Sequence, residues 1–172
     1  MSASTSSARY KKAAGRRTLK NLRTSPKVFL FLRIRYTRYM ELVSITKTAR
    51  TYPRLPYQEL KNDILGDTYA LSLVFIGSDR ARTLNQETRG KEYVPNVLSF
   101  PLTNTAGEIY ITPTQAKLEA PKFGLTTDGY IAYLYIHGLL HLKGHDHGDE
   151  MDTHEATYMK RYGFDKRYKL KG

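Results

Sequence analysis

The sequence of 172 residues contains no cysteine and no long apolar run. Without cysteine, neither a disulfide framework nor thiolate metal ligation is available, which fits a reducing compartment such as the cytoplasm. No run approaches the roughly 20 apolar residues that span a bilayer, and the apolar residues 28–32 are followed directly by Arg33. We therefore expect a cytoplasmic protein with no membrane partner, folded as one domain that is large enough to bury a core.

Negative charge is absent from the start of the chain, where the first acidic residue is Glu41. Residues 1–39 contain eleven of the 28 Lys and Arg residues; the other 17 nearly balance the 16 Asp and Glu residues, so the net charge of +12 lies almost entirely in this segment. We expect residues 1–39 to be a basic N-terminal extension, disordered or outside the fold, and residues 40–172 to form the folded domain. Three interpretations of the extension stay open: an arm that binds RNA phosphates, an organelle transit peptide, or sequence upstream of a translation start at Met40.

From Met40 onward the apolar pattern changes repeatedly between strand-like and helix-like spacing. We expect strands at residues 42–46, 71–77, 97–100 and 107–112, and helices at residues 57–65, from Ser78, from Thr126 or Thr127 through Leu142, and at about 149–162. Strands mixed with helices, and including a hairpin, predict an α+β (mixed α/β) fold. Its small mixed sheet of about four strands would be covered by helices.

Four of the five histidines lie within residues 137–147, which read HGLLHLKGHDH. His137 and His141 are four residues apart and project from one face of a helix. Gly144 follows where a helix would end in the left-handed conformation, so the chain can fold back and bring His147 toward the other two. Three imidazole ligands leave a fourth position to water, which is typical of catalytic zinc. The spacing therefore predicts one Zn²⁺ per chain, bound by His137, His141 and His147 at the C-terminal end of a long helix.

The same spacing, H-x-x-x-H-x-x-G-x-x-H, occurs in metzincin proteases, which carry a general-base Glu directly after the first His. Here that position is Gly138, so a zinc protease would need a carboxylate from elsewhere, such as Glu108 or Glu150. An ordinary helix end with hydrogen-bonded imidazoles would explain one or two of the histidines, not three in ligand register. The role of His145 stays open: it replaces His147 as third ligand, lines the site, or faces solvent.

A second motif spans residues 84–101, LNQETRGKEYVPNVLSFP, where a helix end and a polar loop lead into a strand. The loop places Arg89 and Lys91 where they can meet an anion. Together the two motifs resemble the YbeY family of single-strand-specific endoribonucleases, which mature ribosomal RNA. The family pattern pairs an L-N-x-x-x-R-x-K loop and a V-L-S-F-P strand with a later H-G-x-L-H-L-x-G-x-D-H helix end. This chain has both in that order, over about residues 40–165.

The resemblance implies zinc ligation by His137, His141 and His147 and a catalytic, phosphate-facing role for Arg89. It also implies a substrate, single-stranded RNA in the precursor of small-subunit rRNA. The activity would be 16S rRNA 3′-end maturation and ribosome quality control, with the ribosome or ribosomal proteins as partners. Two alternatives remain: a non-catalytic, zinc-stabilised RNA-binding or ribosome-assembly factor, and a zinc metalloprotease.

The chain departs from the family pattern at several positions near the two motifs. Pro95-Asn96 stands where the family usually has Thr-Asp, which removes a negative charge from the loop. Thr88 replaces an aromatic residue, Glu92 replaces Asp, and His145 replaces Tyr. The zinc motif itself is intact.

Overall fold

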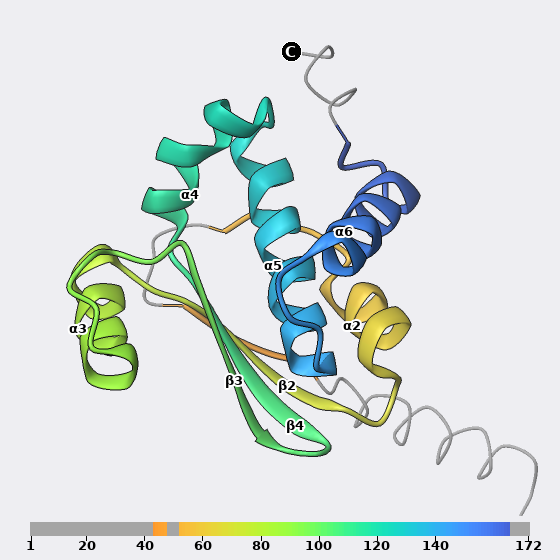
Figure 1. Cartoon of the computed structure of the whole chain (residues 1–172), viewed down its shortest axis with the longest axis horizontal. Coiled ribbons are helices and arrows are strands. Elements are labelled where there is room, and N and C mark those ends of the chain that lie inside the picture. Colours follow the sequence, from red (N-terminus) through yellow and green to blue (C-terminus); the bar gives the residue numbers. More distant parts are fainter. Residues whose placement is uncertain (1–42, 48–51, 166–172) are drawn as a thin grey trace, which may run out of the picture. The chain divides into compact units, whose positions relative to one another are not determined.

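The computed structural model describes residues 43–47 and 52–165. The basic extension expected over residues 1–39 lies outside the described residues. Element labels agree with those printed in Figure 1. The described elements are, in chain order, β1 (Val43–Lys47), α2 (Tyr57–Leu65), β2 (Ala70–Phe75), α3 (Ser78–Arg89), β3 (Val97–Thr103), β4 (Ala106–Ile111), α4 (Pro113–Glu119), η1 (Ala120–Phe123), α5 (Thr127–Lys143) and α6 (Asp149–Arg161). None of the described helices combines the length and the apolar character that crossing a bilayer requires.

In the described part of the chain, four strands form one mixed sheet in the order β1-β2-β4-β3. β1 and β2 are parallel, as are β2 and β4, while β3 runs antiparallel to β4. The β3–β4 pair is the expected hairpin, with Ser99 opposite Ile109. The predicted mixed α/β class, with a small sheet of four strands and helices packed on it, is confirmed.

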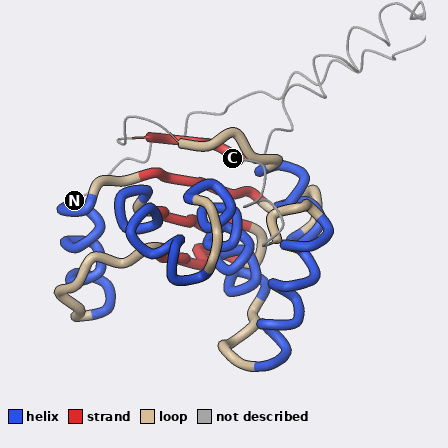
Figure 2. The backbone as a smooth tube through the Cα atoms, turned by 90° about the horizontal axis from the view of Figure 1, so that it is seen from above, coloured by secondary structure: helices blue, strands red, loops and turns tan. Residues whose placement is uncertain are grey.

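One face of the sheet carries the core because apolar side chains alternate along its central strands. Leu71, Leu73 and Phe75 of β2 are buried, as are Ile109 and Ile111 of β4. Helix α5 packs on this face and contacts α2, α4 and α6; in Figure 1 α2 and α6 lie to the right of α5 and α4 lies to its left. Figure 2, seen from above, shows helices lying over the strands. The sheet and the flanking helices thus surround the helix that carries His137 and His141.

Helix α5 begins and ends where the sequence predicts. The side chain of Thr126 accepts a hydrogen bond from the backbone N–H of Gly129 at 3.0 Å, which satisfies one of the free donors of the first turn. Gly144 ends the helix at φ 101°, a left-handed conformation that glycine adopts without a Cβ clash. Tyr130 and Tyr135 are 1% and 0% exposed, so these aromatic residues of α5 belong to the core.

The sequence pattern did not predict the short helices α4 and η1. Pro113 occupies the first turn of α4, where a missing N–H costs nothing. Ala116 is the buried residue of this helix and Ala120 that of η1, so neither segment shows an apolar periodicity that separates it from a loop. The sequence favours Ser78 as the N-cap of α3; the helix instead begins at Ser78, and its N-cap is Gly77.

The buried hydroxyl of Tyr135 ties α5 to α2 and gives a test of this packing. Its Oη donates to the backbone oxygen of Tyr57 at 2.9 Å, and the two rings meet edge to face at 5.1 Å between centroids. Tyr135→Phe keeps the ring but leaves a buried carbonyl with one partner fewer. We expect urea denaturation to show a loss of about 1–2 kcal/mol in the free energy of unfolding.

Tyr158→Phe is the matched control, because the Tyr158 hydroxyl is exposed and lies 3.5 Å from the carbonyl of Asp63. We expect it to change the free energy of unfolding by less than about 0.5 kcal/mol. Equal losses for the two variants would contradict the contact between α5 and α2.

Candidate metal centre and cleft

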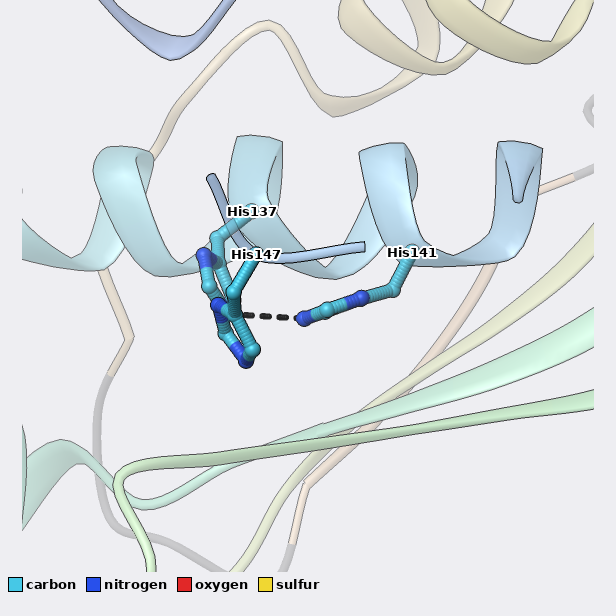
Figure 3. Close-up of side chains that lie close together, drawn as sticks. All are labelled: His137, His141 and His147. Atoms are coloured by element: carbon cyan, nitrogen blue, oxygen red, sulfur yellow. Dashed lines mark hydrogen bonds between the residues drawn. The ribbon is translucent and has the colours of Figure 1, made fainter. Parts of the chain in front are cut away.

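The structure brings together the three histidines that the spacing singled out. His137 and His141 lie one turn apart on α5, and the turn at Gly144 returns the chain so that His147 reaches them from the loop before α6. One ring nitrogen of each lies within 4.8 Å of the other two, and the Nε2 atoms of His137 and His141 are 3.1 Å apart. Figure 3 shows His141 pointing at the rings of His137 and His147. We call this group the three-histidine cluster.

The outer nitrogens of His137 and His141 are held by groups that accept hydrogen bonds. Nδ1 of His137 lies 2.6 Å from Oε1 of Glu155, and Nδ1 of His141 lies 3.0 Å from the backbone oxygen of His145. A carboxylate oxygen and a backbone carbonyl accept hydrogen bonds, so these contacts favour the tautomers that carry the proton on Nδ1. In the neutral rings both Nε2 atoms then present lone pairs to each other at 3.1 Å. A cation between them removes this repulsion, so the donor set fits a metal ion.

Glu155 is a part of the site that the sequence motif did not reveal. Glu155 is 6% exposed. Its carboxylate also accepts a side-chain hydrogen bond from Tyr133, and burial together with this acidic neighbour raises the pKa of Tyr133. The signal was present in the sequence of α6. Met151, Glu155 and Met159 recur every four residues and form its buried face, and a carboxylate in such a row needs a partner.

The protonation of His141 also suits metal binding. Burial lowers the pKa of His141, and the nearby His137, His147 and Arg89 lower it further, against the opposing effect of the His145 carbonyl. A lowered pKa keeps the imidazole neutral near physiological pH, which is the form that binds metals.

A cleft opens beside the three-histidine cluster and has a volume of about 560 Å³. Its other wall is formed by the loop after α3 and by β3, and contains Arg89, Tyr93, Pro95, Asn96, Val97, Ser99 and Pro101. Arg89 is the last residue of α3 and precedes Gly90, whose φ of 65° lets the chain turn into the loop. The structure therefore places the Arg89 motif and the histidine motif in one cleft, although about 50 residues separate them in the sequence.

Asn96 is bonded in a way that explains its departure from the family pattern. Its side-chain nitrogen lies 3.2 Å from a carboxylate oxygen of Glu119 and 3.0 Å from Oη of Tyr130, while its own oxygen accepts from the N–H of Val97. Glu119 also accepts from Tyr130, which with burial raises the pKa of that hydroxyl to about 12. An aspartate at this position would face Glu119 as a second negative charge, so the neutral amide is the residue that fits.

Gly138 lies where the protease template has its general base, and it does not face the cleft. A Cβ at this position would meet three carbon atoms of the buried Ile109 at 3.0–3.3 Å. A side chain here would point into β4, and not toward a bound substrate. Of the other carboxylates considered, Glu108 accepts a hydrogen bond from Tyr110, and neither Glu108 nor Glu150 lines the cleft. The geometry thus disfavours the protease alternative.

His145 does not join the three-histidine cluster through its side chain. Its ring groups with Glu150 and His154 instead, while its backbone oxygen faces His141. The third member of the three-histidine cluster is therefore His147, and not His145.

The comparisons with known proteins agree with this geometry. The family model described as Endoribonuclease YbeY matches residues 39–164. A protein named Endoribonuclease YbeY from Neisseria gonorrhoeae is 33% identical over 72% of this chain and 80% of its own length, and one from Bdellovibrio bacteriovorus is 35% identical over 68% and 79%. The solution structure of TM1509 from Thermotoga maritima matches with a TM-score of 0.55 and 26% identity, over 74% of this chain and 93% of that one.

The family model covers most of the chain, the two relatives are 33% and 35% identical over 72% and 68% of it, and the solved structure has the same fold. The chain belongs to the YbeY family of endoribonucleases.

Proposed function

We propose that the protein is a zinc-dependent, single-strand-specific endoribonuclease that matures the 3′ end of 16S rRNA and acts in ribosome quality control. Its substrate would be the precursor of small-subunit rRNA, met in the cytoplasm on or near the ribosome and its proteins. The observation that carries the proposal is the meeting of the three-histidine cluster with Arg89 across one cleft. Membership of an endoribonuclease family supports RNA as the molecule that enters this cleft.

Zinc is the metal that the donor set favours. The proposed ligands His137, His141 and His147 are imidazoles, which suit zinc better than they suit magnesium or calcium. The exposed position of His147 leaves one side of the cluster open toward the cleft, as in catalytic rather than closed structural sites. When bound, zinc supplies Lewis acidity, which lowers the pKa of water in the open position toward neutrality.

Arg89 is the proposed phosphate-binding residue. Its side chain is exposed at the cleft wall, and the guanidinium group can donate two parallel hydrogen bonds to a phosphodiester. It would hold the scissile phosphate against the three-histidine cluster and offset the negative charge that grows during the reaction.

Tyr93 gives the same cleft an aromatic surface. It is 60% exposed although it is large and apolar, so its ring is free to stack on an unpaired base. Stacking of this kind needs bases that are not paired, and it therefore supports a preference for single-stranded RNA.

The central test of this proposal is cleavage of single-stranded RNA from the 3′ end of a small-subunit rRNA precursor. We expect chelated protein to be inactive, zinc to restore cleavage, and His141→Ala to abolish it, because that variant loses one ligand and the contact with the His145 carbonyl. Products that end in 2′,3′-cyclic phosphate would indicate attack by the RNA 2′-hydroxyl, and 3′-hydroxyl products attack by water. Protein that holds one zinc ion per chain but cleaves no RNA would favour the non-catalytic RNA-binding factor.

Arg89→Ala tests the phosphate clamp separately from the metal. We expect the rate of RNA cleavage to fall by about 10²–10³, as for the loss of one transition-state donor, with zinc affinity unchanged. Arg82→Ala is the matched control, because Arg82 is an exposed cation on the same helix whose nearest acidic partner is Asp79. Equal losses of activity in the two variants would show that only the charge of α3 matters, and not a clamp at Arg89.

Glu155→Gln tests the carboxylate that orients His137. The amide keeps the size of the side chain but removes the charge from the 2.6 Å contact. We expect zinc affinity, measured by competition with a chromophoric chelator, to fall by about 10–100-fold. Unaltered affinity in a folded variant would remove Glu155 from the support of the site.

A further inference from the structure

A second group of potential metal ligands lies next to the three-histidine cluster. Ligand atoms of His145, Glu150 and His154 all lie within 4.8 Å of one another. Oε1 of Glu150 is 3.5 Å from Nδ1 of His145 and 3.8 Å from Nε2 of His154, and the two rings are 4.8 Å apart between centroids. None of these three side chains belongs to the cleft or to the three-histidine cluster.

The geometry of this group suits a small divalent cation. Two ligands about 2.0–2.1 Å from a tetrahedral zinc ion are about 3.4 Å from each other, so the distances of 3.5 and 3.8 Å need to close only slightly. Glu150 and His154 stand one turn apart on the first turns of α6, and His145 faces them from the loop after α5. Two imidazoles and one carboxylate form a ligand set that zinc and its neighbours among the transition metals accept.

Ordinary surface ion pairs explain this grouping less well. The side chain of Glu150 is 78% exposed and that of His154 is 42% exposed, and pairs exposed to this degree contribute little. The N–O distances of 3.5 and 3.8 Å are also longer than ordinary N–H···O hydrogen bonds, so direct bonds between the rings and the carboxylate do not account for the grouping. A cation bound between the two rings and the carboxylate accounts for ligand atoms that face one another at these distances.

We propose that His145, Glu150 and His154 form an accessory site for a divalent transition metal of the zinc class. The accessory site is open to solvent, so water completes the coordination and binding is weaker than at the three-histidine cluster. Its ligands come from two segments, and a bound ion therefore fixes the loop of residues 144–148 to the start of α6.

The accessory site shares backbone segments with the three-histidine cluster. The same His145 whose ring faces Glu150 offers its backbone oxygen to Nδ1 of His141. His154 directly precedes Glu155, which holds Nδ1 of His137. The loop that the accessory ion would fix also carries His147. Occupancy of the accessory site thus restrains the segments that orient all three histidines of the cluster.

The test is a metal titration of the full chain, which needs no RNA and does not depend on nuclease activity. Metal-free protein is titrated with Zn²⁺ by calorimetry and with Co²⁺ by visible absorption. We expect two ions per chain, with the second bound more weakly. His141→Ala should impair the first step and keep an accessory step, while His154→Gln should keep the first step and lose the second.

Two further variants sharpen the assignment. Glu150→Gln should weaken the second step by at least about tenfold, since it removes the charged ligand. Asp149→Asn is its matched control, because it removes one negative charge from the adjacent exposed position on the same turn without touching a ligand, and its second step should equal that of wild type. His145→Tyr, which keeps the backbone oxygen that faces His141, should also lose the second step.

The outcomes decide the proposal in either direction. Binding of a single ion per chain by wild type, with any second step absent at millimolar Zn²⁺, would overturn it. So would a second ion that persists in folded His154→Gln and His145→Tyr proteins, because that ion would have other ligands. Failure of RNA cleavage would leave the accessory site unaffected, and loss of the accessory site would leave the proposed nuclease activity standing.

Discussion

The close approach of α5 to β4 is the constraint on which the rest of the structure depends. Gly138 leaves so little room that a Cβ would lie 3.0 Å from Ile109, and this contact fixes the rotation of α5 about its own axis. With Gly138 turned to the sheet, the residues His137 and His141 face the cleft. A bulkier residue would force α5 away from the strand, because close-packed interiors yield little. The position that a protease would use for its base is here used for packing.

Helix α6 contributes to both the core and the three-histidine cluster through one row of residues. Met151 and Met159 bury themselves against the core, and Glu155 lies between them in the same row. The packing of α6 on α5 therefore also delivers the carboxylate to His137 at 2.6 Å. A buried carboxylate is costly without partners, and here Tyr133 and His137 supply them. The packing that holds α6 against α5 therefore also orients the imidazole of His137.

Local patterns in the sequence predicted most of the fold and the convergence of His137, His141 and His147. The spacing of His137, His141 and His147 around Gly144 follows from helix geometry alone, and so does the cap at Thr126. What the sequence did not predict depends on contacts between distant segments. Glu155 reaches His137 across 18 positions, and Asn96 reaches Tyr130 across 34. Helix α4 has one buried residue, Ala116, and its amphipathic signal is correspondingly absent.

The departures from the family pattern change the groups that the cleft offers for the proposed chemistry. The side-chain nitrogen of Asn96 lies 3.2 Å from a carboxylate oxygen of Glu119. An aspartate at position 96 would place a second carboxylate there. Asn96 and Glu119 therefore belong together, and an amide neither gives nor takes a proton at neutral pH. Glu119 itself is engaged by Tyr130 and Gln115 as well. None of the described residues that line the cleft is a carboxylate, so the proposed chemistry would rest on the three-histidine cluster, with whatever ion it binds, and on Arg89. A cation site opposite an arginine is suited to an anionic backbone such as that of RNA, and it lacks the general base that peptide hydrolysis on the protease template requires.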